Sequence, residues 1–144
     1  MSSTASVDAR SLTILLVDDD DIDVMNVQRA LKKAGLEIPL HIAGDGVAAL
    51  ELLRSGALPA RRLLVLLDIN MPKMNGIEFL RAIRKDPTLK SLCVVVLTTS
   101  NEERDRIEAY QLNVAGYLLK PVTFHNFVEV LLTLNRYWQL MEMP

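Results

Sequence analysis

The sequence predicts an α/β fold in which helices cover both faces of a five-stranded parallel sheet. Three observations support this prediction: five short apolar runs recur along the 144 residues, segments with helical spacing separate them, and the runs are mostly continuous rather than alternating. Continuous apolar runs are typical of strands that are buried on both faces. Strands that alternate with helices in this way form a doubly wound (βα)5 sheet with right-handed crossovers.

The strands are expected over residues 12–17, 39–43, 62–67, 92–97 and 115–119. After the first strand, apolar residues spaced by three and four predict a helix that Asp20 or Asp21 caps and Gly35 ends. After the second strand, a helix is expected to begin near Asp45 and to end near Gly56.

The three remaining helices follow the later strands. One is expected to begin after Asn75 and to stop before Pro87, because proline cannot continue a helix. The next, over residues 101–112, is polar apart from Ile107, Tyr110 and Leu112. The last is expected over residues 123–140.

The composition fits one compact domain. Lys and Arg number 16 against 18 Asp and Glu, so the net charge is −2, and 50% of the residues are hydrophobic. This balance offers no basic surface for nucleic acid or for anionic membranes, and no apolar run approaches the roughly 20 residues that span a bilayer. The lone Cys93 lies in an apolar run and is expected to be a small core residue.

The chain ends lead to three further expectations. Residues 1–11 are small and polar and lack the apolar stretch of a signal peptide, so we expect a disordered tail and a cytoplasmic location. The folded domain is expected over residues 12–141. No output domain is expected after it.

Polar side chains follow four of the five predicted strands. Asp18 and Asp19 follow the first strand, Asp68 the third, Thr98 the fourth and Lys120 the fifth. Each alone has an ordinary explanation as a helix cap, a turn residue or a solvated charge. However, ligand sites in open α/β sheets lie at the carboxyl ends of the strands, where these five residues converge.

These residue types suit phosphoryl transfer to a carboxylate. Clustered carboxylates repel one another and favour a bound cation, and hard oxygen ligands suit Mg²⁺. A lysine and a hydroxyl could then offset and bind the oxygens of a phosphoryl group, with a carboxylate as the nucleophile.

Four motifs resemble the receiver domain of two-component response regulators, and are similar to the chemotaxis switch protein. They are LLVDD (15–19), LLDINMPKMNG (66–76), VVVLTTS (94–100) and YLLKP (117–121). They occur in the family's order, and the resemblance covers about residues 12–135. It implies a flavodoxin-like receiver fold and a phosphorylation switch that is not an enzyme, since it promotes only its own phosphorylation and dephosphorylation.

The resemblance assigns the central site residues. Asp68 would be the phosphoacceptor. Asp18, Asp19, Asp68 and the backbone carbonyl of Asn70 would hold Mg²⁺, with Mn²⁺ as a substitute. Thr98 and Lys120 would bind the phosphoryl group. Because four aspartates follow the first strand, Asp19 and Asp20 are the competing metal pair.

The resemblance also assigns accessory roles. Tyr117 would change position when Thr98 is drawn toward the phosphoryl group. Pro121 would follow a cis peptide bond that aims the preceding lysine. Asn70 and Ser100 would flank the path of attacking water and tune dephosphorylation.

The last helix carries more apolar surface than a helix on one sheet needs. Its apolar side chains cover an arc of about 220°, whereas a stripe a little over 100° wide is sufficient. We therefore expect a homodimer, although the tail could instead fold back over its own domain. The candidate contact residues are Val130, Leu134, Tyr137, Trp138 and Met141.

The expected partners are a sensor histidine kinase or a phosphotransfer protein. The extended last helix and the motifs VVVLTTS and DINMPKMNG resemble those of regulators that partner bacterial phytochrome-type kinases. Two alternatives remain open from the sequence. One is a Mg²⁺-dependent phosphatase with an aspartyl nucleophile, because residues 18–20 contain a D-x-D pattern. The other is a receiver-like module that binds partners without phosphorylation.

Overall fold

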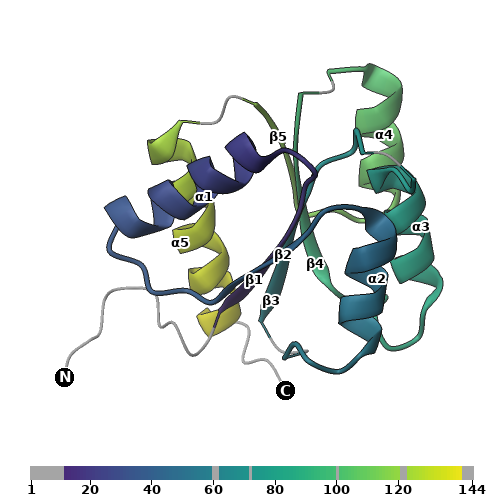
Figure 1. Cartoon of the computed structure of the whole chain (residues 1–144), viewed down its shortest axis with the longest axis horizontal. Coiled ribbons are helices and arrows are strands. Elements are labelled where there is room, and N and C mark those ends of the chain that lie inside the picture. Colours follow the sequence, from purple (N-terminus) through teal and green to yellow (C-terminus); the bar gives the residue numbers. More distant parts are fainter. Residues whose placement is uncertain (1–11, 60–61, 72, 100, 121–122, 141–144) are drawn as a thin grey trace.

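A parallel five-stranded sheet forms the centre of the molecule (Figure 1). The computed structural model describes residues 12–59, 62–71, 73–99, 101–120 and 123–140. The strands are β1 (Thr13–Val17), β2 (Leu40–Ala43), β3 (Leu63–Leu67), β4 (Cys93–Thr98) and β5 (Gly116–Leu119). Their order in the sheet is β2-β1-β3-β4-β5, and every neighbouring pair is parallel. The predicted α/β doubly wound fold is confirmed.

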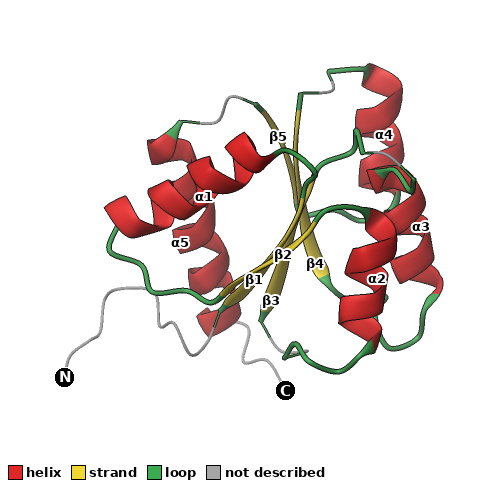
Figure 2. Cartoon of the chain, viewed as in Figure 1, coloured by secondary structure: helices red, strands yellow, loops and turns green. Residues whose placement is uncertain are grey.

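In the described part of the chain, five helices cover the two faces of the sheet (Figure 2). They are α1 (Asp21–Lys33), α2 (Gly46–Arg54), α3 (Gly76–Lys85), α4 (Glu103–Gln111) and α5 (Phe124–Leu140). Helices α1 and α5 lie on one face, and α2, α3 and α4 lie on the other. The predicted boundaries agree with these bounds to within two residues.

Alternate residues of the central strands enter different cores. In β3, Val65 and Leu67 belong to the core beneath α2, α3 and α4, whereas Leu64 and Leu66 belong to the core beneath α1 and α5. A strand buried on both faces needs apolar side chains at every position, which explains the continuous runs. The edge strands depart from this expectation: Ile42 of β2 is 43% exposed and Leu119 of β5 is 38% exposed, because no strand lies beyond them in the sheet.

Side chains at the helix N-termini end the loops that follow the strands. Asp20 caps α1 by accepting a hydrogen bond from the amide of Ile22, and Asp45 caps α2 through the amide of Ala48. Asn75 caps α3 and forms a reciprocal capping box with Glu78. Such caps satisfy amides that have no partner within the helix, so they start each helix at a defined residue next to a strand end.

The buried face of α4 differs from the one that its large apolar residues suggest. Ile107 and Tyr110 are 51% and 49% exposed, whereas the small Ala109 is fully buried. The face toward the sheet passes through Asp105, Ala109 and Leu112, at spacings of four and three, which places Ile107 on the opposite side. Ile107 and Tyr110 therefore do not mark the packing face of this segment, whereas Ala109 and Leu112 do.

Part of the apolar surface of α5 is used within the chain. Phe127 and Leu131 are buried, and the dimer candidates Val130 and Leu134 are half-buried against the same core. Met141 and the side chains of Tyr137 and Trp138 lie outside the described residues, as does the expected tail over residues 1–11. Cys93 is half-buried and packs against the same core, at its margin rather than inside it.

Candidate functional site

Residues at the carboxyl ends of β1, β3, β4 and β5 meet at one edge of the sheet. Backbone hydrogen bonds extend the strand pairing to this edge: the amide of Asp68 donates to the carbonyl of Val17 at 2.9 Å, and the amide of Lys120 donates to that of Thr98 at 2.8 Å. Because the pairing continues to the strand ends, the side chains there are held by the rigid sheet rather than by loops alone.

Three carboxylates form a cluster at this edge. Asp18 and Asp68 are 2% and 6% exposed, whereas Asp19 is open to solvent. One oxygen from each lies within 4.8 Å of the others. Two ligands on opposite sides of an octahedral Mg²⁺ are about 4.2 Å apart, so a small side-chain adjustment would bring these oxygens around a divalent cation. The cluster thus fits a hard cation in both ligand type and spacing.

The second aspartate pair considered from the sequence is used differently. The carboxylate of Asp20 caps α1, and its backbone amide donates to Oδ1 of Asp18 at 2.9 Å. Among the described residues, the group of three that could hold a cation joins Asp68 to Asp18 and Asp19. The geometry therefore favours Asp18 and Asp19 over Asp19 and Asp20.

Lys120 supplies the positive charge of the site. Its Nζ lies 2.7 Å from Oδ2 of Asp18, 2.5 Å from Oδ2 of Asp23 and 3.5 Å from Oδ2 of Asp68. Burial by itself would lower the pKa of Lys120, but the hydrogen bonds to Asp18 and Asp23 and the charge of Asp68 outweigh it and raise the pKa to about 12. The ammonium is therefore charged at any physiological pH.

Asp18 shows the cost of burying a carboxylate at this edge of the sheet. Burial raises the pKa of Asp18 from its ordinary 3.8 to about 6, against the opposing effect of hydrogen bonds from Lys120 and the Asp20 amide. A carboxylate that is removed from water and lies beside another one gains most from an additional nearby cation. The burial of Asp18 is thus a second feature of the site that suits a metal ion.

Asp68 is oriented by two hydrogen bonds to the same oxygen. The hydroxyl of Thr98 donates to Oδ1 of Asp68 at 2.7 Å, and the backbone amide of Asn70 donates to it at 3.2 Å. The contacts described for Asn70 are through this amide, so its carbonyl as a metal ligand remains a prediction. The other oxygen of Asp68, Oδ2, faces Lys120.

The accessory residues are placed less completely. Tyr117 is half-buried on β5, and the guanidinium of Arg106 from α4 lies 5.3 Å from its ring centroid. Ser100 and Pro121 lie outside the described residues, so their predicted roles stay predictions.

One site residue was missed by sequence reasoning. Asp23, on the first turn of α1, contacts Lys120, yet it was not singled out among the acidic residues of this segment. No spacing along the chain distinguishes it from Asp20 and Asp21, because its contact with Lys120 joins residues 97 positions apart.

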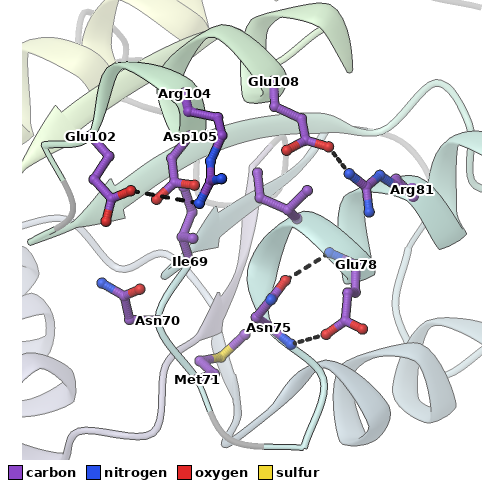
Figure 3. Close-up of a pocket in the computed structure, with 11 residues that line it drawn as sticks. Ile69, Asn70, Met71, Asn75, Glu78, Arg81, Glu102, Arg104, Asp105 and Glu108 are labelled. Carbon is purple, nitrogen blue, oxygen red and sulfur yellow. Dashed lines mark hydrogen bonds and ion pairs between the residues drawn. The ribbon is translucent and has the colours of Figure 1, made fainter.

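A polar cleft of about 640 Å³ lies beside the carboxylates, between the β3–α3 loop and α4 (Figure 3). Its wall carries ion pairs between Arg81 and Glu108 and between Arg104 and Glu102. Asn70 enters it from the β3–α3 loop, but none of the three clustered carboxylates lines it. The candidate site is therefore the carboxyl-terminal edge of the sheet, and the cleft lies next to it.

Comparison with known proteins agrees with this geometry. Residues 14–132 match the model of the response regulator receiver domain. The chain belongs to the response regulator receiver family. Receiver domains are signalling switches of two-component systems, and they are generally not catalytic enzymes.

Three relatives illustrate the family. The response regulator Rcp1 of Synechocystis is 38% identical over 128 residues, covering 87% of each chain. A crystal structure of Rcp1 in its Mn²⁺-bound form has a TM-score of 0.72 and covers 88% of this chain and 94% of that one, at 37% identity. The phosphorylated cyanobacterial phytochrome response regulator RcpA has a TM-score of 0.74 at 34% identity, covering 89% and 94%. The chemotaxis protein CheY-3 of Vibrio cholerae is 37% identical over 114 residues, covering 79% and 84%. The resemblance to phytochrome-associated and chemotaxis regulators is thus confirmed.

Proposed function

We propose that this protein works as a response regulator that accepts a phosphoryl group on Asp68 and signals through changed contacts with other proteins. The observation that carries the proposal is the position of Asp68, buried at the sheet edge between Thr98 and Lys120 and clustered with two further aspartates. A buried carboxylate with a hydroxyl and an ammonium on either side matches what phosphoryl transfer to a carboxylate requires.

Each residue has a distinct task in the proposed reaction. An oxygen of Asp68 forms a bond to phosphorus while the bond from phosphorus to the donor's leaving atom breaks. Lys120 and the hydroxyl of Thr98 bind the oxygens of the transferred group. Mg²⁺, or Mn²⁺ in its place, would be held by Asp18, Asp19, Asp68 and the carbonyl of Asn70. When bound, it would offset negative charge on the phosphoryl oxygens.

The accessory residues regulate the lifetime and readout of the phosphorylated state. Asn70 and Ser100 control the approach of water to the acyl phosphate. Pro121 sets the turn that aims Lys120. Tyr117, next to α4, changes position when Thr98 moves, which alters the surface formed by α4, β5 and α5.

The proposed phosphodonor is a sensor histidine kinase of phytochrome type, or a phosphotransfer protein. The sequence similarity of this chain to Rcp1 and to the phytochrome response regulator RcpA supports this assignment. A groove of about 620 Å³ between α1 and the start of α5 reaches Lys120 and contains apolar Phe124 and Phe127, and Met25 of α1 is 51% exposed. These features suit α1 as the docking helix for such a partner.

A homodimer through α5 and a cytoplasmic location complete the proposal. Val130 and Leu134 are only half-buried, so they can extend a contact that Tyr137, Trp138 and Met141 would continue. Changing both Tyr137 and Trp138 to Ala is expected to shift sedimentation from dimer to monomer, and a parent protein that already sediments as a monomer would contradict the dimer.

None of the helices in the described part of the chain has the length and apolar character needed to cross a membrane.

The central test is intact mass after incubation with acetyl phosphate, with Mg²⁺ or with excess EDTA. A single phosphoryl adduct is expected only with Mg²⁺, and Asp68→Asn should abolish it. Asp86→Asn is the matched control, because Asp86 lies at the end of α3 and is paired with Arg54. If the parent protein forms no adduct and also fails to bind beryllofluoride, the proposed function is wrong. Repeated turnover of a phosphomonoester would instead indicate a phosphatase.

A further inference from the structure

The ammonium of Lys120 is held by two aspartates, and one of them lies outside the carboxylate cluster. We propose that Asp23 is a positioning residue: it anchors the Lys120 ammonium from α1 so that the ammonium stays directed at the oxygens of Asp68. This inference rests on the proposed function, since it assigns the residue that prepares Lys120 for the phosphoryl group.

The geometry of the three contacts supports an anchor. A lysine ammonium has three donors on a flexible four-carbon stem, so one partner alone leaves it free to turn. Here Asp18 and Asp23 accept hydrogen bonds at 2.7 and 2.5 Å, and Oδ2 of Asp68 lies 3.5 Å from the ammonium nitrogen. The side chain of Lys120 is 11% exposed and that of Asp23 is 22% exposed, so water screens this ion pair only partly.

Asp23 differs from Asp18 in what else it must do. Asp18 also accepts the amide of Asp20 and belongs to the cluster that fits a cation, so its oxygens serve several partners. Asp23 belongs to no such group among the described residues. It also lies on the first turn of α1, a rigid element whose N-cap is in place. When a cation engages Asp18, Asp23 remains to hold Lys120.

The substitution Asp23→Asn tests this anchor, because it keeps the size of the side chain and removes its charge. Loss of one charge-assisted hydrogen bond corresponds to about a tenfold change in a rate or equilibrium constant, so the rate of phosphorylation by acetyl phosphate is expected to fall by about five- to tenfold. Asp21→Asn is the matched control, since Asp21 lies in the same helical turn and is exposed. In a Lys120→Met background, Asp23→Asn should change the rate by less than about twofold, because the shared contact is already lost.

A spectroscopic readout tests the contact without any phosphodonor. In ¹H–¹⁵N spectra of lysine ammonium groups, the signal that disappears in Lys120→Met identifies Lys120. Its protons are expected to exchange slowly with water in the parent protein and in Asp21→Asn, and rapidly in Asp23→Asn. Unchanged slow exchange in Asp23→Asn, or faster phosphorylation of that variant, would overturn the proposal. A parent protein that accepts no phosphoryl group would overturn the proposed function and leave the ammonium spectra to decide the positioning role on their own.

Discussion

Gly76 begins α3 and lies against the backbone of the phosphoacceptor strand, so one added methyl group tests how closely these segments pack. A Cβ at this position would lie 2.6 Å from the carbonyl oxygen of Asp68 and 2.7 Å from Cα of Ile69. Contacts of Cβ atoms below 3.0 Å are essentially never seen, and both neighbours here are backbone atoms that no rotamer change can move aside. Gly76→Ala must therefore push α3 away from the end of β3.

The expected cost follows from this overlap. Forcing an extra carbon into a packed site costs about 1–3 kcal/mol, and the rigid backbone on both sides places Gly76→Ala at about 2–3 kcal/mol. An unfolding entropy of about 2.1 cal/mol/K per residue over this chain gives about 0.3 kcal/mol/K, so Tm should fall by about 7–10 °C. The displacement of α3 should also weaken beryllofluoride binding, because it moves the backbone of Asp68.

Two other glycines provide controls of graded severity, measured by urea and thermal unfolding. A Cβ at Gly44 would meet nothing within 4 Å, so Gly44→Ala should change stability by less than about 0.5 kcal/mol. At Gly46 the Cβ would meet the side chain of Met74 at 2.8 Å, and this flexible chain can move, so the cost should be intermediate. If Gly76→Ala is as stable as Gly44→Ala, the proposed close packing of α3 against β3 is wrong.

Three further predictions concern other parts of the molecule. Arg84 donates hydrogen bonds to the backbone carbonyls of Lys90, Leu92, Leu112 and Asn113, so Arg84→Met should lower the free energy of unfolding by about 2–4 kcal/mol in urea titrations. The side chain of Arg81 is half exposed, so Arg81→Met should lower it by less than about 1 kcal/mol, and equal losses in the two variants would refute the reasoning. Burial raises the pKa of the Cys93 thiol from 9.0 to about 11, so iodoacetamide at pH 8 should alkylate this thiol about 100 times more slowly in the folded chain than in urea, and equal rates would contradict the raised pKa. The same pKa shift contributes stability below pH 9, and this contribution is lost as the pH rises toward 11. Thr98→Val removes the hydroxyl donor to Asp68 at nearly constant shape and should weaken beryllofluoride binding about tenfold by calorimetry, while unchanged affinity would remove Thr98 from the proposed site.

Much of the fold could be predicted because its signals are local. A strand buried on both faces must be apolar at every position, and helix starts carry their caps in the sequence, as Asp45 and Asn75 show. Signals that depend on distant neighbours were less informative. The half-exposed edge strands and the packing of α4 through Ala109 depend on strand order and helix placement, which no local pattern encodes.

The sequence by itself predicted the edge of the sheet where the site lies and five of the residues that gather there, namely Asp18, Asp19, Asp68, Thr98 and Lys120. The polar residues follow or end apolar strands at their carboxyl ends, and parallel strands place those ends at the same edge of the sheet whatever the strand order is. Only the tertiary structure decided which of them touch. The pairing of Lys120 with Asp23 joins residues 97 positions apart, and the use of Asp20 as a cap separates it from the cluster around Asp68. These choices depend on the angle at which α1 leaves β1 and on side-chain packing over a few ångströms, and spacing along the chain carries no information about either.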